Sequence, residues 1–133
     1  RHYLKAIDLN PRSHQAYNNL GAIVMKKGRV DDAIIYFKKA LKINPEYEKA
    51  HFSLGVAFNK RGNYDQAVMH YQKALDINPD FEQARNNLCV AFFYAGKTRD
   101  AMDCFQESLQ KNPENLTAKE NYEKALLLFK NVP

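Results

Sequence analysis

The sequence predicts an all-α solenoid, in which helix pairs of one repeated unit stack side by side. The dipeptide Asn-Pro occurs at a fixed interval of 34 residues, at Asn10-Pro11, Asn44-Pro45, Asn78-Pro79 and Asn112-Pro113. A glycine recurs at the same interval, at Gly28, Gly62 and Gly96. An unbroken period of this length is typical of repeat proteins, whose units pack on their neighbours.

Both the Asn-Pro dipeptide and the recurring glycine are expected to end helices. Proline has no backbone N–H and disfavours helical geometry in the residue before it, so each Asn-Pro ends a helix. Glycine adopts the left-handed conformation that closes a helix C-terminus. Each unit therefore contains two helices, the first ending near the glycine and the second near the proline.

The period divides the chain into one domain, 1–133, with three full repeats at 12–45, 46–79 and 80–113. Residues 1–11 correspond to the second helix of a partial repeat, and residues 114–133 to a terminal helix that matches the first helix of a repeat. The expected architecture is thus three full repeats with a partial repeat at each end.

Apolar residues in each repeat follow the spacing of three and four that an amphipathic helix requires. In the first repeat the two expected core stripes are Ala16, Leu20, Ile23 and Val24, then Ala33, Phe37, Ala40 and Leu41. Asp31 and Asp32 favour the start of the second helix and can cap it. The third repeat departs from the other two, with Cys89 in place of glycine and Ser108 in place of alanine.

Charge and composition limit the partners. The net charge of +5 is compatible with acidic ligands, and the basic residues stand on turns without aromatic interleaving, so we expect no nucleic acid. No apolar run approaches the roughly 20 residues of a membrane span. Cys89 and Cys104 are read as isolated thiols that suit core packing or a reducing compartment, and we expect a cytoplasmic protein.

The residues Tyr17, Leu20-Gly21, Val24, Ala33, Phe37, Ala40 and Pro45 resemble the signature of the tetratricopeptide repeat. The match extends over essentially the whole chain, although Tyr17, His51 and Arg85 stand where the signature has tryptophan. The resemblance implies a right-handed superhelix whose first helices line a concave groove. It also implies a non-enzymatic scaffold that binds peptides or other proteins.

If the stripes face the core, the opposite side of each first helix faces that groove. One column of this side holds amides or a hydroxyl at Asn19, Ser53, Asn87 and Asn121. Such a column can pair with the backbone of an extended peptide and resembles the asparagine ladders of peptide-binding tetratricopeptide repeats. The alternative is that these residues only favour solubility.

Aromatic side chains are the candidate anchors, because exposed aromatics in grooves often dominate binding. They are Phe52, Phe93 and Tyr94, and the alternative is that they pack between helices. The remaining residues expected in the groove are Asn18, Val56, Asn59, Asn86 and Val90. Some relatives grip a carboxylate with Lys at the places of Asn18 and Asn86, and with Asn or Arg at Ala22 and Val90. Neither pair fits, so we expect no such clamp.

The two ends of the array are complementary. Tyr3 and Ile7 at one end and Leu127, Leu128 and Phe129 at the other could bury each other in head-to-tail contacts between molecules. The alternatives are a fragment of a longer array and a repeat arm of a larger enzyme. Four scattered histidines stand beside no nucleophile, and neither a phosphate loop nor a zinc signature occurs, so we expect no catalysis, cofactor or metal.

Overall fold

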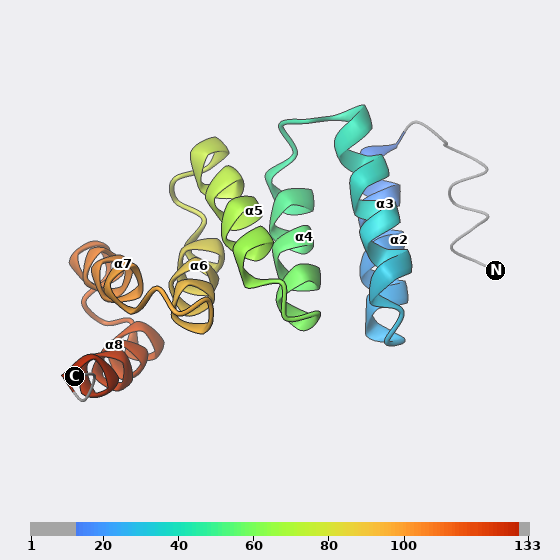
Figure 1. The fold of residues 1–133 in the computed structure, drawn as a ribbon. Coiled ribbons are helices and arrows are strands. Elements are labelled where there is room, and N and C mark those ends of the chain that lie inside the picture. The colour runs from blue at the N-terminus through green and yellow to red at the C-terminus, as the bar shows by residue number, and fades with distance from the viewer. Residues whose placement is uncertain (1–12, 131–133) are drawn as a thin grey trace.

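The computed structural model describes residues 13–130, and these residues form seven α-helices (Figure 1). The helices are α2 (His14–Lys26), α3 (Val30–Ile43), α4 (Glu48–Lys60), α5 (Tyr64–Ile77), α6 (Glu82–Tyr94), α7 (Thr98–Lys111) and α8 (Leu116–Lys130). No strand occurs between residues 13 and 130, so the all-α prediction is confirmed. Residues 1–11, expected to form a second helix, lie outside the described residues.

The helices end at the recurring glycine and Asn-Pro positions, as the sequence predicted. Gly28 has a positive φ of 83°, and Gly62 and Gly96 have 79° and 81°. After α2 the amide of Arg29 donates to the carbonyl of Val24 at 3.1 Å, which satisfies an otherwise open carbonyl at the helix C-terminus. After α3 the backbone becomes extended at Asn44, whose side-chain oxygen accepts a hydrogen bond from the amide of Glu46 at 3.2 Å.

The start of α3 differs from the expectation of an acidic cap. Arg29 occupies the capping position, and no side chain accepts a capping hydrogen bond there. Asp32 instead pairs with Arg29 at 2.6 Å, and Asp31 pairs with Arg61 at 3.1 Å. Both acids still lie in the first turn, where their charge favours the helix dipole.

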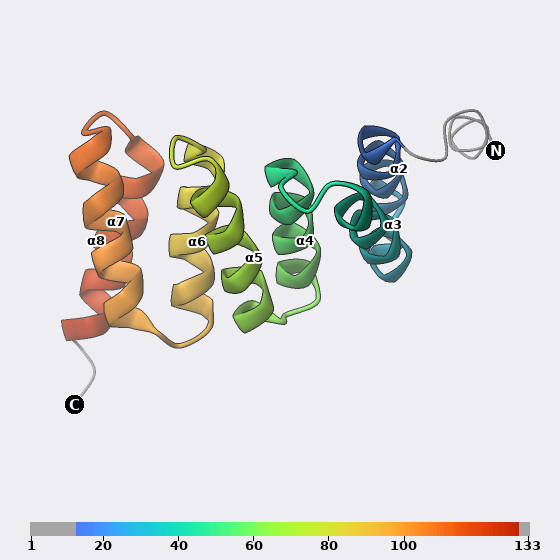
Figure 2. The ribbon, with the colours of Figure 1, turned by 90° about the horizontal axis from the view of Figure 1, so that it is seen from above.

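Successive helices pack as antiparallel pairs, and the stack curves (Figures 1 and 2). Helix α2 contacts α4, α4 contacts α6, and α6 contacts α8, whereas within residues 13–130 α3 does not contact α5 and α5 does not contact α7. The first helices of the repeats are therefore closer together than the second helices. The curvature places α2, α4, α6 and α8 on the inner, concave side of the solenoid.

Small residues bring the helices of each pair together. Alanines are fully buried at equivalent positions, at Ala33, Ala40, Ala50, Ala67, Ala74, Ala84 and Ala101. In the first pair a Cβ atom on Gly21 would lie 2.4 Å from Cε1 of Phe37, so glycine is required for this approach. Close packing of this kind over every repeat builds one continuous core.

The expected core position of Ile23 is wrong. Leu20 and Val24 are buried as predicted, but Ile23 is 40% exposed. The equivalent residues one and two repeats later, Ala57 and Ala91, are fully buried because α4 and α6 also pack against a preceding pair. Helix α2 is the first described helix, so the same side of it has no such cover among the described residues.

The reading of the two cysteines as isolated thiols is also wrong. Cys89 of α6 and Cys104 of α7 form a disulfide, with their Cα atoms 5.3 Å apart. The two helices face each other within the third repeat, and this brings together cysteines that are 15 residues apart in the sequence. The inference of a reducing compartment rested on free thiols, so that argument no longer holds.

Candidate functional site

A small cavity opens on the concave side between α6 and α8. Its volume is about 100 Å³, and its lining is Val90, Phe93, Tyr94, Phe105, Asn121 and Lys124. The sequence had singled out four of these residues as groove residues, namely Val90, Phe93, Tyr94 and Asn121. The structure therefore brings the predicted residues of two different repeats together at one cavity, which we call the concave cavity.

Two lining residues were missed by the sequence reasoning. Phe105 comes from α7 and is buried, so it forms the floor of the concave cavity. Lys124 comes from α8 and follows Val90 by one period of 34 residues. That register would have identified Lys124, whereas Phe105 reads as an ordinary core position.

Aromatic rings border the concave cavity on one side. Tyr94 is 58% exposed, and its ring stacks on that of Tyr64 with a centroid distance of 5.4 Å. The ring of Phe93 meets Tyr94 edge-on at 5.8 Å. We call Tyr64, Tyr94 and Phe93 the aromatic strip. Exposed rings held in place by other rings can bind apolar ligand groups at a low cost in side-chain entropy.

The aromatic strip leads from the concave cavity to a second, wider cavity. This second cavity has a volume of about 560 Å³ and is lined by the turn 62–66 together with Tyr94 and Ala95. Tyr94 thus lines both cavities. A ligand that covers Tyr94 can reach from the concave face to the turn between α4 and α5.

The four residues of the predicted polar column differ in their exposure to solvent. Asn19 is exposed, while Ser53, Asn87 and Asn121 are half-buried. The side chain of Asn87 hydrogen-bonds the hydroxyl of Tyr71, which burial would otherwise leave without a partner. Burial raises the pKa of Tyr71 to about 12, and the hydrogen bond from Asn87 opposes that rise. Asn87 therefore stabilises the core, and Asn121 is the member of the column that lines the concave cavity.

Phe52 lies between repeats. Its ring is 4.9 Å from that of Phe81 and 5.8 Å from that of Tyr71, measured between centroids. One repeat later the same two positions hold Asn86 and Asn115, whose side chains are hydrogen-bonded at 3.1 Å. Phe52 and Asn86 are therefore engaged in contacts between repeats, which fits the packing alternative for Phe52.

The other expected groove residues lie at different depths. Val56 is half-buried on α4. Asn18 is only 9% exposed, and this leaves little of its side chain for a ligand. The side-chain oxygens of Asn18 and Asn59 are buried without a hydrogen-bond donor. An unpaired buried acceptor of this kind costs stability.

The residues expected at the end of the stack are in part visible. Leu127 is 65% exposed and Leu128 is 51% exposed. In the repeat register they follow Phe93 and Tyr94 by 34 residues, so they continue the aromatic strip onto α8. Tyr3, Ile7 and the side chain of Phe129 lie outside the described residues.

Two buried histidines, His51 of α4 and His70 of α5, contact each other. Nδ1 of His51 lies 3.5 Å from Nδ1 of His70, and Nε2 of His51 donates to the carbonyl of Pro45 at 3.0 Å. Burial, with smaller contributions from His51, Lys73 and Lys38, lowers the pKa of His70 to about 4. The ring of His70 is therefore neutral at pH 7 and serves packing.

The turns carry ion pairs between consecutive repeats. Arg61 pairs with Asp31 at 3.1 Å, and Lys97 pairs with Asp65 at 3.8 Å. All four side chains are largely exposed, so each pair contributes little to stability. Part of the positive charge on these turns is thus paired with acids of the preceding repeat.

Between residues 13 and 130 no group of three or more histidine, cysteine, aspartate or glutamate side chains is placed to hold a metal ion. None of the helices formed by these residues has both the length and the apolar character needed to cross a membrane.

Solved structures share this fold. The protein YrrB, described as a TPR protein with an unusual peptide-binding site, superposes with a TM-score of 0.83 at 18% identity, over 95% of this chain and 65% of its own. MamA superposes with a TM-score of 0.78 at 26% identity, over 86% of this chain and 62% of its own. The chain therefore spans less than two thirds of the length of these two structures.

A third structure was solved with a ligand. The first TPR domain of Spaghetti (RPAP3), bound to the HSP90 peptide SRMEEVD, superposes with a TM-score of 0.84 at 18% identity, over 90% of this chain and 94% of its own. No curated protein matches the chain by sequence.

Sequence profiles decide the family. Two profiles described as tetratricopeptide repeat match the chain, one over residues 12–80 and one over residues 58–118. Together they cover every helix from α2 to α7, and the first alone covers more than half of the chain. The chain belongs to the tetratricopeptide repeat family.

Proposed function

We propose that this chain is a non-catalytic protein-interaction module that binds a peptide segment of a partner protein on its concave face. The observation that carries the proposal is the concave cavity, where Val90, Phe93 and Asn121 of two repeats converge. Relatives in fold are described with a peptide-binding site or a bound peptide, which supports the same class of ligand.

The chemistry of the concave cavity selects the ligand. Its volume of about 100 Å³ suits one aliphatic side chain, and Val90, Phe93 and Phe105 offer that side chain apolar contacts. Asn121 and Lys124 lie at the same opening and can hydrogen-bond the backbone or a carboxylate of the ligand. The ligand is thus a segment with an aliphatic residue, flanked by a group that accepts hydrogen bonds.

The mode of binding does not use a carboxylate clamp. Asn18 and Asn86 carry no charge, and both are engaged or buried within the fold. The cation on this face that lines the concave cavity is Lys124, which belongs to α8 and to a different column. Recognition is therefore proposed to rest on the apolar anchor rather than on a free C-terminus.

A display selection of random peptides tests the proposal. Peptides selected on the wild-type chain are labelled, and their binding to Val90→Lys is measured by fluorescence polarisation. The repeat register supports this variant, because the equivalent residue on α8 is Lys124. A lysine on the exposed convex residue Ile35 is the matched control.

Peptides that use the concave cavity lose affinity about tenfold or more on Val90→Lys, since a charge then occupies the apolar subsite. They keep their affinity on Ile35→Lys. Peptides that bind both variants equally well would place the ligand elsewhere and would overturn the proposal.

Self-association is the second candidate function. Leu116, Leu127 and Leu128 are exposed on α8, and an apolar surface of this kind is typical of a contact region. Head-to-tail contacts between copies, or a further repeat of a longer polypeptide that includes an enzyme, would each cover it. Light scattering at several protein concentrations measures the mass of the wild-type chain and of Leu127→Lys. A homo-oligomer would show a lower mass in the variant, whereas a monomer would show the same mass in both.

A further inference from the structure

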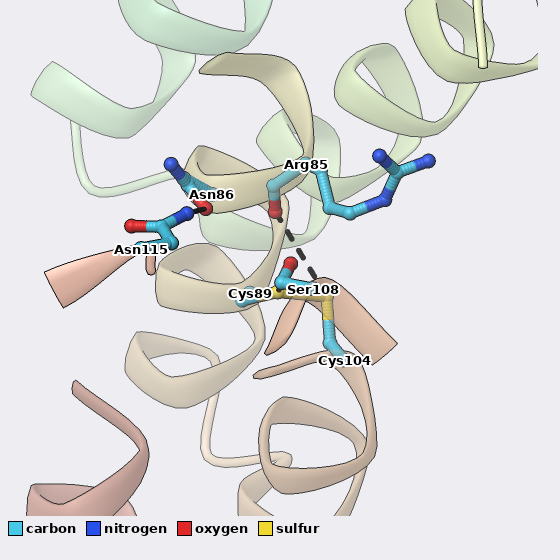
Figure 3. Close-up of a disulfide and its surroundings, with 6 residues drawn as sticks. All are labelled: Arg85, Asn86, Cys89, Cys104, Ser108 and Asn115. Carbon is cyan, nitrogen blue, oxygen red and sulfur yellow. Dashed lines mark hydrogen bonds between the residues drawn. A yellow bond between two sulfur atoms is a disulfide. The ribbon is translucent and has the colours of Figure 1, made fainter. Parts of the chain in front are cut away.

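The third repeat departs from the first two at positions that meet in space. Cys89 stands at the place of Gly21 and Gly55. Cys104 stands at the place of Tyr36 and His70, and Ser108 at the place of Ala40 and Ala74. Figure 3 shows Cys89, Cys104 and Ser108 side by side between α6 and α7. Repeats drift at scattered positions, so substitutions gathered around one bond indicate a site added to the repeat.

The disulfide takes the place of the glycine contact that joins the other pairs. A Cβ on Gly21 would lie 2.4 Å from the ring of Phe37, and one on Gly55 would lie 2.4 Å from the ring of Tyr71. Cys89 does carry a Cβ, and Phe105, the equivalent aromatic residue, is still buried. The ring of Phe105 therefore cannot approach α6 as closely, and a covalent bond joins the helices instead.

Each sulfur already has a polar neighbour that suits the reduced state (Figure 3). Sγ of Cys89 lies 3.9 Å from the hydroxyl of Ser108, which can donate to a thiolate. Sγ of Cys104 lies 3.9 Å from the carbonyl oxygen of Arg85, which can accept from a thiol. In the first two repeats alanine occupies the place of Ser108, so this hydroxyl accompanies the cysteines.

One of the two sulfurs belongs to a residue at the surface. Cys89 is fully buried, whereas Cys104 is half-buried and lines an open cavity of about 380 Å³ together with Leu75, Leu88 and Glu107. A thiol from solution can therefore reach Cys104 first. Attack on a disulfide proceeds through a mixed disulfide, and the buried sulfur is then the leaving group.

We propose that Cys89–Cys104 is a redox-active disulfide that undergoes exchange with an external dithiol and thereby controls the concave cavity. A thiolate of the dithiol bonds to Sγ of Cys104, and the bond to Cys89 breaks, leaving a thiolate that Ser108 hydrogen-bonds and solvent protonates. The second thiol of the dithiol then releases Cys104 as a thiol. The dithiol is oxidised to its disulfide, and the two cysteines are reduced with two electrons and two protons.

The bond can control the concave cavity because each cysteine precedes a lining residue. Val90 follows Cys89 on α6, and Phe105 follows Cys104 on α7. After reduction the α6–α7 pair has neither the glycine contact nor the covalent bond, so the positions of Val90 and Phe105 are less fixed. The control of ligand binding rests on the proposed function, whereas the exchange reaction itself does not.

The test compares the oxidised chain with the chain reduced by dithiothreitol, with thiol titration to count free thiols. Hydrogen exchange is then measured for the amides of α6 and α7, and those of α2 and α3 serve as an internal reference. A matched variant combines Cys89→Gly, Cys104→Tyr and Ser108→Ala. It gives the third repeat the residues of the first and restores the glycine contact without a disulfide.

The oxidised chain is expected to show no free thiol, and the reduced chain two. Reduction should accelerate exchange in α6 and α7 by about tenfold or more through local opening, with little change in α2 and α3. The matched variant should be insensitive to dithiothreitol. Cys89→Ser with Cys104→Ser should resemble the reduced chain in both redox conditions.

Two results would overturn the proposal. Free thiols in the folded chain after air oxidation would show that the bond does not form. Complete reduction without faster exchange in α6 and α7 would show that the bond does not hold the pair. Exchange that responds to reduction, combined with peptide affinities that do not, would leave a redox site and remove its control over the ligand. Neither readout of the exchange reaction needs a ligand, so failure of the proposed function would be recognised separately.

Discussion

Gly55 of α4 lies directly against the ring of Tyr71 of α5, so closely that a Cβ atom on Gly55 would be 2.4 Å from Cε1 of Tyr71. Tyr71 is buried, and its hydroxyl is hydrogen-bonded by Asn87 of the next repeat. One side chain thus joins the two helices of its own pair to the pair that follows. The relationship explains why the second repeat tolerates glycine inside a helix, where that residue is otherwise unfavourable.

Gly55→Ala is expected to lower the free energy of unfolding by about 1–3 kcal/mol, the usual cost of overpacking a core. Alanine is a better helix former than glycine by about 1 kcal/mol. If the ring of Tyr71 moved away from the new Cβ, the variant would therefore be more stable than the wild-type chain. Urea unfolding measures the difference, and Ser53→Ala on the same helix controls for propensity. An increase in stability would show that the ring of Tyr71 can move aside.

The buried histidine pair predicts a loss of stability at acid pH. The pKa of His70 is about 4 in the folded chain and 6.5 without perturbation, so below pH 6.5 the unfolded chain binds a proton that the folded chain does not. Stability is therefore fully present above pH 6.5 and falls as the pH drops toward 4. The loss between pH 7.5 and pH 5 should be about 2 kcal/mol.

Urea unfolding at several pH values measures this dependence. His70→Tyr, which introduces the residue of the first repeat, should remove most of the slope between pH 6.5 and 5. His51, Lys73 and Lys38 also act on His70, and burial is the largest cause of the shift. An unchanged slope in the variant would assign the acid sensitivity to other groups.

A substitution at Phe52 distinguishes a role in packing between repeats from a role in ligand binding. Because its ring contacts Phe81 and Tyr71, Phe52→Ala should lower the free energy of unfolding by about 2–3 kcal/mol. This is less than the roughly 3–5 kcal/mol of a fully buried phenylalanine, since Phe52 is only half-buried. Affinity for peptides selected on the wild-type chain should change little. Thermal unfolding and fluorescence polarisation measure the two quantities on one preparation, and the opposite pattern would make Phe52 an anchor of the groove.

The sequence predicted the elements well because their signals are local. Gly28 and Asn44 end helices through their own backbone preferences, so the period alone placed α2 and α3. Ile23 was assigned wrongly because its burial depends on a neighbouring pair and not on the periodicity of α2. The pattern of one helix does not say whether a further unit covers it.

The candidate site was predicted in part for a related reason. Val90, Phe93 and Asn121 follow from the register of the repeat, which states the face of a helix but not the depth of a residue. Phe52 shares that face and is packed by Phe81. The disulfide was missed because the spacing of Cys89 and Cys104 fits no sequence motif, and only the facing of α6 and α7 brings the sulfurs together.

The central claim is that a partner's peptide binds the concave face at α6 and α8. Amide chemical shifts of the labelled chain, titrated with a peptide selected on it, test this most directly. The account predicts that the largest changes fall on Val90, Phe93, Tyr94, Asn121 and Lys124. Changes gathered instead on the convex residues Ile35 and Met69 of α3 and α5 would contradict it.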